Sequence, residues 1–335
     1  MEASANWNAY DAEDMVRSDR DYLWHHLKPH KVFQSAEQMI IVEGKGLRVT
    51  DIRGKEYLDA TSGGVWSVMV GHGRESIAKA IYDQLITLGY YAGSVGNIPT
   101  IKFAAKLVEL LPNLDKVYFS NSGSEANEKA FKIIRQLSHM DPERKGKYKI
   151  LYRDRDYHGT TIGALSATGQ HQRKQDFGPF AEGFAEFPHA LCYRCPFDKS
   201  YPGCDIDCAR SLEEVILKEG PESIGGCIVE PITAGGGIIV PVPEYYPILQ
   251  EICNKYGIYL IMDEVVCGFG RTGKFWGFEQ YDVDPDMVTM AKGLASSYMP
   301  LSATVTRQAI FDKFLCDPSN PEEAVNYFRD ISTYG

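Results

Sequence analysis

The sequence predicts an α/β fold in which helices cover both faces of a mostly parallel central sheet. From about residue 75, helical stretches alternate with short apolar runs, which is typical of such a sheet. The 335 residues are 44% hydrophobic with a formal net charge of −10, which suits a large buried core. Between residues 39 and 59, glycine-punctuated short runs instead predict a small antiparallel meander.

The elements are expected in the following order. Residues 1–36 show no clean period and are expected to form an arm that packs on another surface. After the meander, the alternating region predicts helices over 75–88, 100–111, 125–138, 208–218 and 244–256. It predicts strands over 116–120, 149–152, 226–230, 258–263, 287–290 and 302–306.

Composition excludes several classes of protein. The acidic balance argues against a nucleic-acid surface, which needs a basic stripe. No stretch of 18 apolar residues is present, so we expect no membrane segment. The first residues lack a basic region followed by an apolar one, so we expect no signal peptide and a cytoplasmic location.

An acid and a lysine follow two of the expected strands. Asp263 ends the run 258–263, and Lys292 follows the run 287–290. Ligands of parallel sheets bind at the carboxyl ends of the strands, so the two side chains are expected to share a site. Pyridoxal 5'-phosphate needs a lysine that forms an imine and an acid that keeps its pyridine nitrogen protonated. The pair therefore favours this cofactor.

A phosphate cradle is expected where the strand 116–120 gives way to a helix. Gly123 and Ser124 stand at this helix start, where free backbone N–H groups bind anions. The alternative is an ordinary helix start, because Ser122 and Glu125 also form a capping box. Tyr157 follows the next strand and can stack on a flat ring, or it can simply pack on the core.

A glycine-rich segment, residues 268–274, fits both the G-x-G-x-x-G pattern and the first seven positions of a P-loop. We reject both interpretations. Phe275 stands where a P-loop has the serine or threonine that binds magnesium, and residues 274–285 show no clear amphipathic helix. A nucleotide-binding module remains the alternative from a different class, and a catalytically inactive scaffold is a third.

Four cysteines cluster in a turn-rich insert: Cys192, Cys195, Cys204 and Cys208. Their spacing permits zinc or disulfides, and the alternative is reduced thiols. The cluster lies far in sequence from Asp263 and Lys292, whose chemistry needs no metal, so we expect no catalytic metal site.

Several motifs together resemble the class III, or ω-amino acid, aminotransferases, over about residues 20–335. They are Asn-Ser-Gly-Ser-Glu-Ala from Asn121, Tyr-His-Gly-Thr from Tyr157, Glu230-Pro, Asp-Glu-Val-Val-Cys-Gly-Phe-Gly-Arg-Thr-Gly from Asp263 and Ala291-Lys-Gly. The resemblance implies a fold-type I transferase that depends on pyridoxal phosphate.

The resemblance also implies a role for individual residues. Lys292 forms the imine and later moves a proton, while Asp263 pairs with the pyridine nitrogen. Val265 packs under the ring and Tyr157 covers its other face. Glu230 lies near Asp263, on the side of the ring hydroxyl.

Three further residues are assigned in the same way, besides Gly123 and Ser124 at the phosphate. Trp66 is expected to line the substrate pocket. Thr333 resembles a threonine that reaches the phosphate of the neighbouring subunit, which implies a homodimer or a dimer of dimers. Arg329 is a candidate cation for the substrate, although a surface or interface salt bridge is the more ordinary interpretation.

The expected reaction moves the amino group of an ω-amine to pyruvate, giving alanine. Taurine, which would give sulfoacetaldehyde, is the expected donor, and β-alanine, 4-aminobutyrate or a diamine are the alternatives. Residues 1–74 are expected to form the arm and small-domain meander, 75–325 the large cofactor domain and 326–335 the start of an interface loop. The family's length leads us to expect most of the C-terminal small domain beyond this chain.

Overall fold

The computed structural model describes residues 7–36, 38–315 and 319–320. The chain divides into two compact units, Met1–Tyr90 and Tyr91–Gly335. No helix in the described ranges is long and apolar enough to cross a membrane. The expected division into an arm, a cofactor domain and an interface loop stays a prediction.

The first unit contains the expected meander, an antiparallel sheet in the order β1-β2-β3. Its elements are α1 (Ala12–Tyr22), α2 (His30–Ser35), β1 (Ile41–Lys45), β2 (Arg48–Asp51), β3 (Glu56–Leu58), α3 (Glu75–Thr87) and the single turns η1 (Trp7–Ala9) and η2 (Ser62–Trp66). The arm contains two helices that the sequence pattern did not predict, α1 and α2. Asp11 begins α1 by accepting a 2.8 Å hydrogen bond from Asp14 N, a capping signal that the sequence carries.

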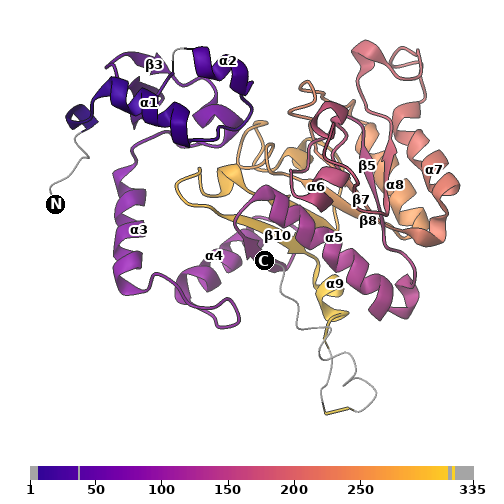
Figure 1. Ribbon diagram of the computed structural model, residues 1–335. Coiled ribbons are helices and arrows are strands. Elements are labelled where there is room, and N and C mark those ends of the chain that lie inside the picture. Colours follow the sequence, from indigo (N-terminus) through magenta and orange to yellow (C-terminus); the bar gives the residue numbers. More distant parts are fainter. Residues whose placement is uncertain (1–6, 37, 316–318, 321–335) are drawn as a thin grey trace. The chain divides into compact units, whose positions relative to one another are not determined.

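The second unit is built on a seven-stranded sheet in the order β4-β10-β9-β8-β7-β5-β6 (Figure 1). The strands are β4 (Lys116–Ser120), β5 (Lys149–Arg153), β6 (Phe184–Phe187), β7 (Ile224–Val229), β8 (Tyr259–Asp263), β9 (Met287–Met290) and β10 (Ser302–Thr306). The helices are α4 (Ile98–Glu109), α5 (Gly123–Met140), α6 (Ile162–Ser166), α7 (Asp207–Glu219), α8 (Tyr245–Tyr256) and α9 (Gln308–Asp312). Single turns are η3 (Pro142–Arg144), η4 (His171–Arg173), η5 (Cys192–Arg194), η6 (Pro221–Ser223), η7 (Gly277–Gln280) and η8 (Lys292–Leu294).

The sheet is mostly parallel, as the sequence predicts. Strands β6, β5, β7, β8 and β9 pair in parallel, and β10 runs antiparallel to both β9 and β4. The chain passes from β9 to β10 with only the single turn η8 between them. A parallel return needs a longer crossover, usually through a helix, so the short connection makes β10 antiparallel.

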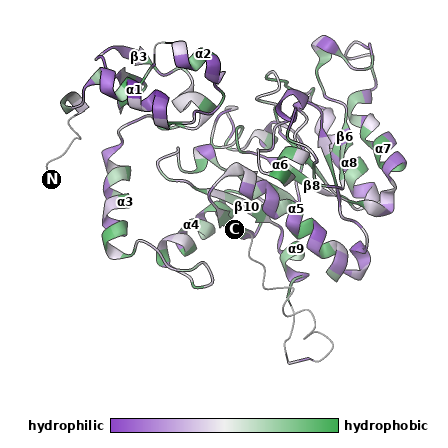
Figure 2. Cartoon of the chain, viewed as in Figure 1, coloured by the Kyte–Doolittle hydropathy of each residue, from purple (hydrophilic) through white to green (hydrophobic). Residues whose placement is uncertain are grey.

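Alternating side chains of the strands build a core on each face of the sheet. Leu260 and Met262 of β8 pack in one cluster with residues of α7 and α8, and Ile261 packs in another with residues of α5. Successive side chains of a strand point to opposite faces, so the two clusters lie on the two faces. Helices therefore cover both faces, and α5 and α7 carry both hydrophilic and hydrophobic segments in Figure 2.

The parallel strands β5, β7, β8 and β9 place their carboxyl ends at one edge of the sheet. The segments that follow these ends carry Tyr157, Glu230 and Lys292, and Asp263 is the last residue of β8. Side chains far apart in sequence are thus brought to one site by strand direction alone.

Two leucines of α7 provide a test of the core. Leu212 is fully buried, whereas Leu217 is 59% exposed. Leu212→Ala should lower the free energy of unfolding by about 2–5 kcal/mol, because it leaves a cavity. Leu217→Ala on the same helix should change it by no more than about 0.5 kcal/mol. Urea unfolding measures both, and equal effects would contradict the assignment of these faces.

Candidate active site

Asp263 is held by groups from three segments of the chain. Its Oδ2 accepts hydrogen bonds from Asn127 Nδ2 and His158 Nδ1, both at 2.8 Å, and its Oδ1 accepts one from Val265 N at 3.0 Å. Asn127 also donates to His158 O at 2.7 Å, which ties α5 to the segment after β5. All three partners donate hydrogen bonds to Asp263. Its carboxylate therefore faces the cavity as a hydrogen-bond acceptor.

Lys292 lies two residues after the end of β9 and shares a cavity with Asp263. Its φ of +41° is unusual for a residue with a side chain and indicates a constrained backbone. Burial lowers the pKa of its amine, against the attraction of Asp263 and Glu230. A lysine must be neutral to attack an aldehyde, so the lowered pKa favours a nucleophile.

Glu230 follows β7, and its carboxyl group is fixed by two backbone donors. Tyr157 N donates to Oε1 at 2.8 Å, and Ala234 N donates to Oε2 at 3.1 Å. Burial raises the pKa of Glu230 well above its usual range, and the nearby Asp156 and Asp263 add to the rise. Glu230 is therefore a buried carboxyl group that retains its proton readily beside the cavity.

The start of α5 combines a capping box with an open helix end. Ser122 Oγ accepts from Glu125 N at 3.3 Å, and Glu125 Oε2 accepts from Ser122 N at 3.1 Å, so the capping-box interpretation is right. The N–H groups of Gly123 and Ser124 make no hydrogen bond to a described residue. Both residues line the cavity, so the helix start can still bind an anion.

The cavity, with an empty volume of about 500 Å³, contains most of the expected site residues. Its lining residues are Gly123, Ser124, Asn127, Tyr157, His158, Gly159, Glu230, Asp263, Val265, Val266, Ala291 and Lys292. An acceptor carboxylate, an amine of lowered pKa, an aromatic ring and a helix N-terminus therefore share one space. Pyridoxal phosphate fits this set of groups, because it presents a ring nitrogen, an aldehyde and a phosphate.

Sequence reasoning missed the residues that position Asp263 and Glu230. Asn127 stands four residues after Gly123 on the same face of α5, a spacing that could have indicated it. The buried Arg153 donates to Asp156 Oδ1 at 3.1 Å and to Glu230 O at 2.7 Å. An arginine at the end of an apolar strand gives no sequence signal of such a network.

Some expected residues are not tested by this arrangement. Trp66 lies in the other compact unit, so its contact with the substrate stays a prediction. Thr333 and Arg329 lie outside the described residues. The cysteines of the insert line a separate cavity as free thiols, and the expectation that they form no catalytic metal site stays a prediction.

The glycine-rich segment 268–274 does not lead into an α-helix. Only the four-residue turn η7 follows it, before the strand β9. A Cβ added to Gly268 would lie 3.0 Å from Glu264 O, so this glycine permits a tight turn. A P-loop requires a helix whose N-terminus holds the phosphate, and the geometry lacks one here.

A comparison with known families identifies the chain. The family model described as "Aminotransferase class-III" matches residues 32–320. The chain belongs to the class-III aminotransferases. It is accordingly a transaminase with pyridoxal phosphate as cofactor.

Its relatives include proteins of known name and structure. It is 54% identical to the taurine–pyruvate aminotransferase of Bilophila wadsworthia (strain 3_1_6) over 326 residues, which cover 97% of this chain and 70% of the relative. It is 52% identical to the hypotaurine/taurine–pyruvate aminotransferase of Paracoccus denitrificans (strain Pd 1222), over 98% of this chain and 70% of the relative.

Solved structures agree with this family. An (S)-enantioselective omega-transaminase from Thermomicrobium roseum has a TM-score of 0.86 at 37% identity, covering 91% of this chain and 68% of its own. The omega transaminase from Pseudomonas jessenii in complex with PMP has a TM-score of 0.86 at 35% identity, covering 89% of this chain and 66% of its own.

A substitution at the start of α5 tests the phosphate cradle. A Cβ at Gly123 would lie 3.0 Å from both methyl groups of Val265. Gly123→Val should therefore crowd the helix start and weaken binding of pyridoxal phosphate by about 10-fold or more, corresponding to about 1.4 kcal/mol. Equilibrium dialysis measures the dissociation constant. Gly203→Val is the matched control, because the nearest atom to a Cβ there is Ser200 O at 3.7 Å. Unchanged affinity in Gly123→Val would place the phosphate elsewhere.

Proposed function

We propose that this enzyme transfers the amino group of taurine to pyruvate, giving sulfoacetaldehyde and alanine. The observation that carries the donor is the relatedness of the chain to four proteins named for taurine and pyruvate, at 50–54% identity. The cavity supports transamination as the reaction type, because Lys292, Asp263 and the start of α5 line the same space.

We assign the chemical roles within the cavity as follows. When bound, pyridoxal phosphate supplies an aldehyde that bonds to amines and a ring that withdraws electrons. Lys292 Nζ, whose pKa is lowered by burial, attaches the cofactor and then carries a proton to and from the substrate carbon. Asp263 accepts the hydrogen bond of the ring nitrogen, and its three donors fix its orientation.

The remaining assigned residues bind and orient the ring. Tyr157 and Val265 line the cavity and are proposed to enclose the ring from its two faces. Gly123 and Ser124 are proposed to hold the phosphate through their N–H groups. Glu230 is proposed to lie at the ring hydroxyl, where its raised pKa permits it to donate a proton.

We also propose a homodimer, or a dimer of dimers, in the cytoplasm. Helix α3 has no buried side chain, and its Leu85 and Ile86 are 55% and 68% exposed. Exposed apolar residues of this kind favour contact with a partner surface. Seven cysteines of the described residues are free thiols, which suits a reducing compartment. Trp66 is proposed to line the substrate pocket, and Thr333 to reach the phosphate of the second subunit.

The donor is tested by a direct comparison of substrates. With pyruvate as acceptor, taurine should give a higher kcat/KM than β-alanine, 4-aminobutyrate and putrescine. Differences in how well small ω-amines fit a pocket are worth about 1–3 kcal/mol, or about 10- to 200-fold in kcat/KM. Alanine formation measures each rate. If taurine gives the lowest kcat/KM while another ω-amine is used, the proposed donor is wrong, although the enzyme remains a transaminase.

The attachment site is tested by chemical labelling. Lys292→Ala should abolish turnover without unfolding the protein, because the amine is lost from a cavity that keeps its other groups. Borohydride reduction of the native enzyme, followed by peptide mapping, should find the pyridoxyl group on Lys292. Lys274→Ala is the control, since that lysine lies in the rejected P-loop segment. A label on any other lysine would contradict the assignment of Lys292 as the attachment site.

A further inference from the structure

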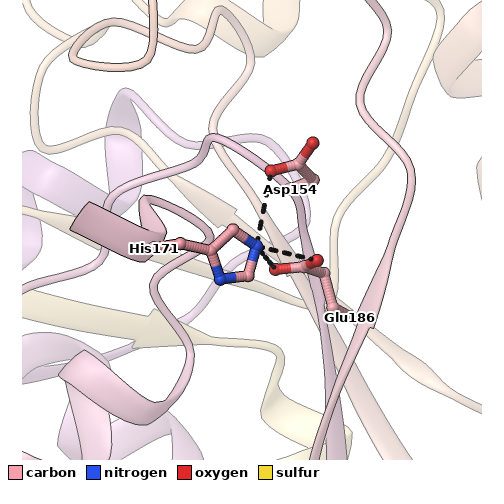
Figure 3. Close-up of side chains that lie close together, drawn as sticks. All are labelled: Asp154, His171 and Glu186. Atoms are coloured by element: carbon pink, nitrogen blue, oxygen red, sulfur yellow. Dashed lines mark hydrogen bonds and ion pairs between the residues drawn. The ribbon is translucent and has the colours of Figure 1, made fainter. Parts of the chain in front are cut away.

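A second group of titratable side chains meets away from the cofactor cavity, at the β6 edge of the sheet. Asp154 follows β5, Glu186 lies on β6 and His171 begins η4. His171 Nε2 lies 3.1 Å from Glu186 Oε2 and 3.9 Å from Asp154 Oδ1, so the imidazole faces both carboxylates (Figure 3). This is the one trio of His, Cys, Asp or Glu ligand atoms within 4.8 Å of one another in the described ranges.

Hydrogen bonding satisfies only one oxygen of the Glu186 carboxylate, because His171 Nε2 lies 3.2 Å from Oε1 of Glu186. Its Oε2 is buried and makes no hydrogen bond in the described part of the chain. The carboxylate of Asp154 lies near the same imidazole nitrogen, so two negative charges share one partner. The nearby Lys174 ammonium attracts Glu186 electrostatically, but its hydrogen bonds go to Tyr152 Oη at 3.1 Å and Ser166 O at 3.0 Å. A cation between the two carboxylates would relieve this repulsion.

A fourth residue, His189, lies beside the trio. Leu191 N donates to His189 Nδ1 at 3.2 Å, so a neutral His189 carries its proton on Nε2. That nitrogen faces Asp154 Oδ2 at 3.8 Å, on the oxygen turned away from His171.

The plain alternative is a surface ion pair. The His171 side chain is 67% exposed, and exposed pairs contribute only about 0–1 kcal/mol. Such a pair explains one carboxylate beside the imidazole. It leaves unexplained why a second carboxylate, that of Asp154, lies 3.9 Å from the same nitrogen.

We propose that Asp154, His171 and Glu186 form a binding site for one divalent transition-metal ion. One imidazole and two carboxylates are ligands that Mn²⁺ and Zn²⁺ both accept, and the exposed side leaves room for water ligands. The ion would bind side chains from three segments, which are the end of β5, η4 and β6. One of them, η4, ends at Arg173, whose guanidinium carbon lies 4.9 Å from the centroid of the Tyr157 ring. The site is thus one turn away from a wall of the cofactor cavity.

Mn²⁺ binding tests the proposal, because Mn²⁺ prefers oxygen and imidazole ligands over the thiols of the cysteine insert. Purified enzyme without a histidine tag, loaded with cofactor and dialysed, is titrated with Mn²⁺ while electron paramagnetic resonance reports the free ion. One equivalent should bind, and the melting temperature should rise with Mn²⁺ concentration. His171→Ala and Glu186→Gln should each weaken binding by about 10-fold or more.

Two controls separate this site from others. His139→Ala removes an exposed histidine of α5, and Cys204→Ser alters the thiol cluster. Both should bind Mn²⁺ as the unchanged enzyme does. Absence of stoichiometric binding at millimolar Mn²⁺, or binding that survives both His171→Ala and Glu186→Gln, would show that the trio is only an ion pair. Glu186→Gln keeps the shape of the side chain, so it decides the matter if His171→Ala fails to fold.

Discussion

The position of Asp263 is the constraint on which the rest of the site depends. The end of β8 sets its backbone, Asn127 of α5 and His158 after β5 hold one oxygen, and Val265 N holds the other. Two of these partners come from segments more than a hundred residues away in sequence. The carboxylate therefore reaches its place only when the helix and both strands have packed, which makes the cofactor site a property of the assembled sheet.

A second layer of buried charge stabilises the neighbouring strand ends. Arg153 donates to Asp156 Oδ1, Glu230 O and Thr233 Oγ1, so one guanidinium satisfies groups from the segments after β5 and β7. Asp156 Oδ2 in turn accepts from Glu230 N at 3.0 Å. A buried ion pair of this kind contributes little net stability, but the loss of one partner leaves an unpaired charge in the core. Its role here is to hold the two segments in register beside the cavity.

The sequence predicted the elements with strong local patterns and missed those that tertiary contacts create. The bounds of β4, β9 and β10 agree with the expected ranges because each is a short apolar run with clear ends. Strand β6 escaped prediction because its four residues pair only with β5, at an edge. In the site, Lys292, Asp263 and Gly123 follow from their places after strands. Arg153 also ends a strand, but its role depends on partners distant in sequence, and only the spacing from Gly123 could have indicated Asn127.

The antiparallel strand β10 has a consequence for the order in which the protein can form during synthesis. It fills the gap between β9 and β4, and pairs Ser302 with Ser120. Until β10 has left the ribosome, β4 has no neighbour in the sheet, and the start of α5 that follows it is not anchored from that side. Pairing between segments so distant in sequence is slow, because loop closure precedes any gain. The helix start that is proposed to bind the phosphate therefore gains its strand support only after β10 has paired with β4.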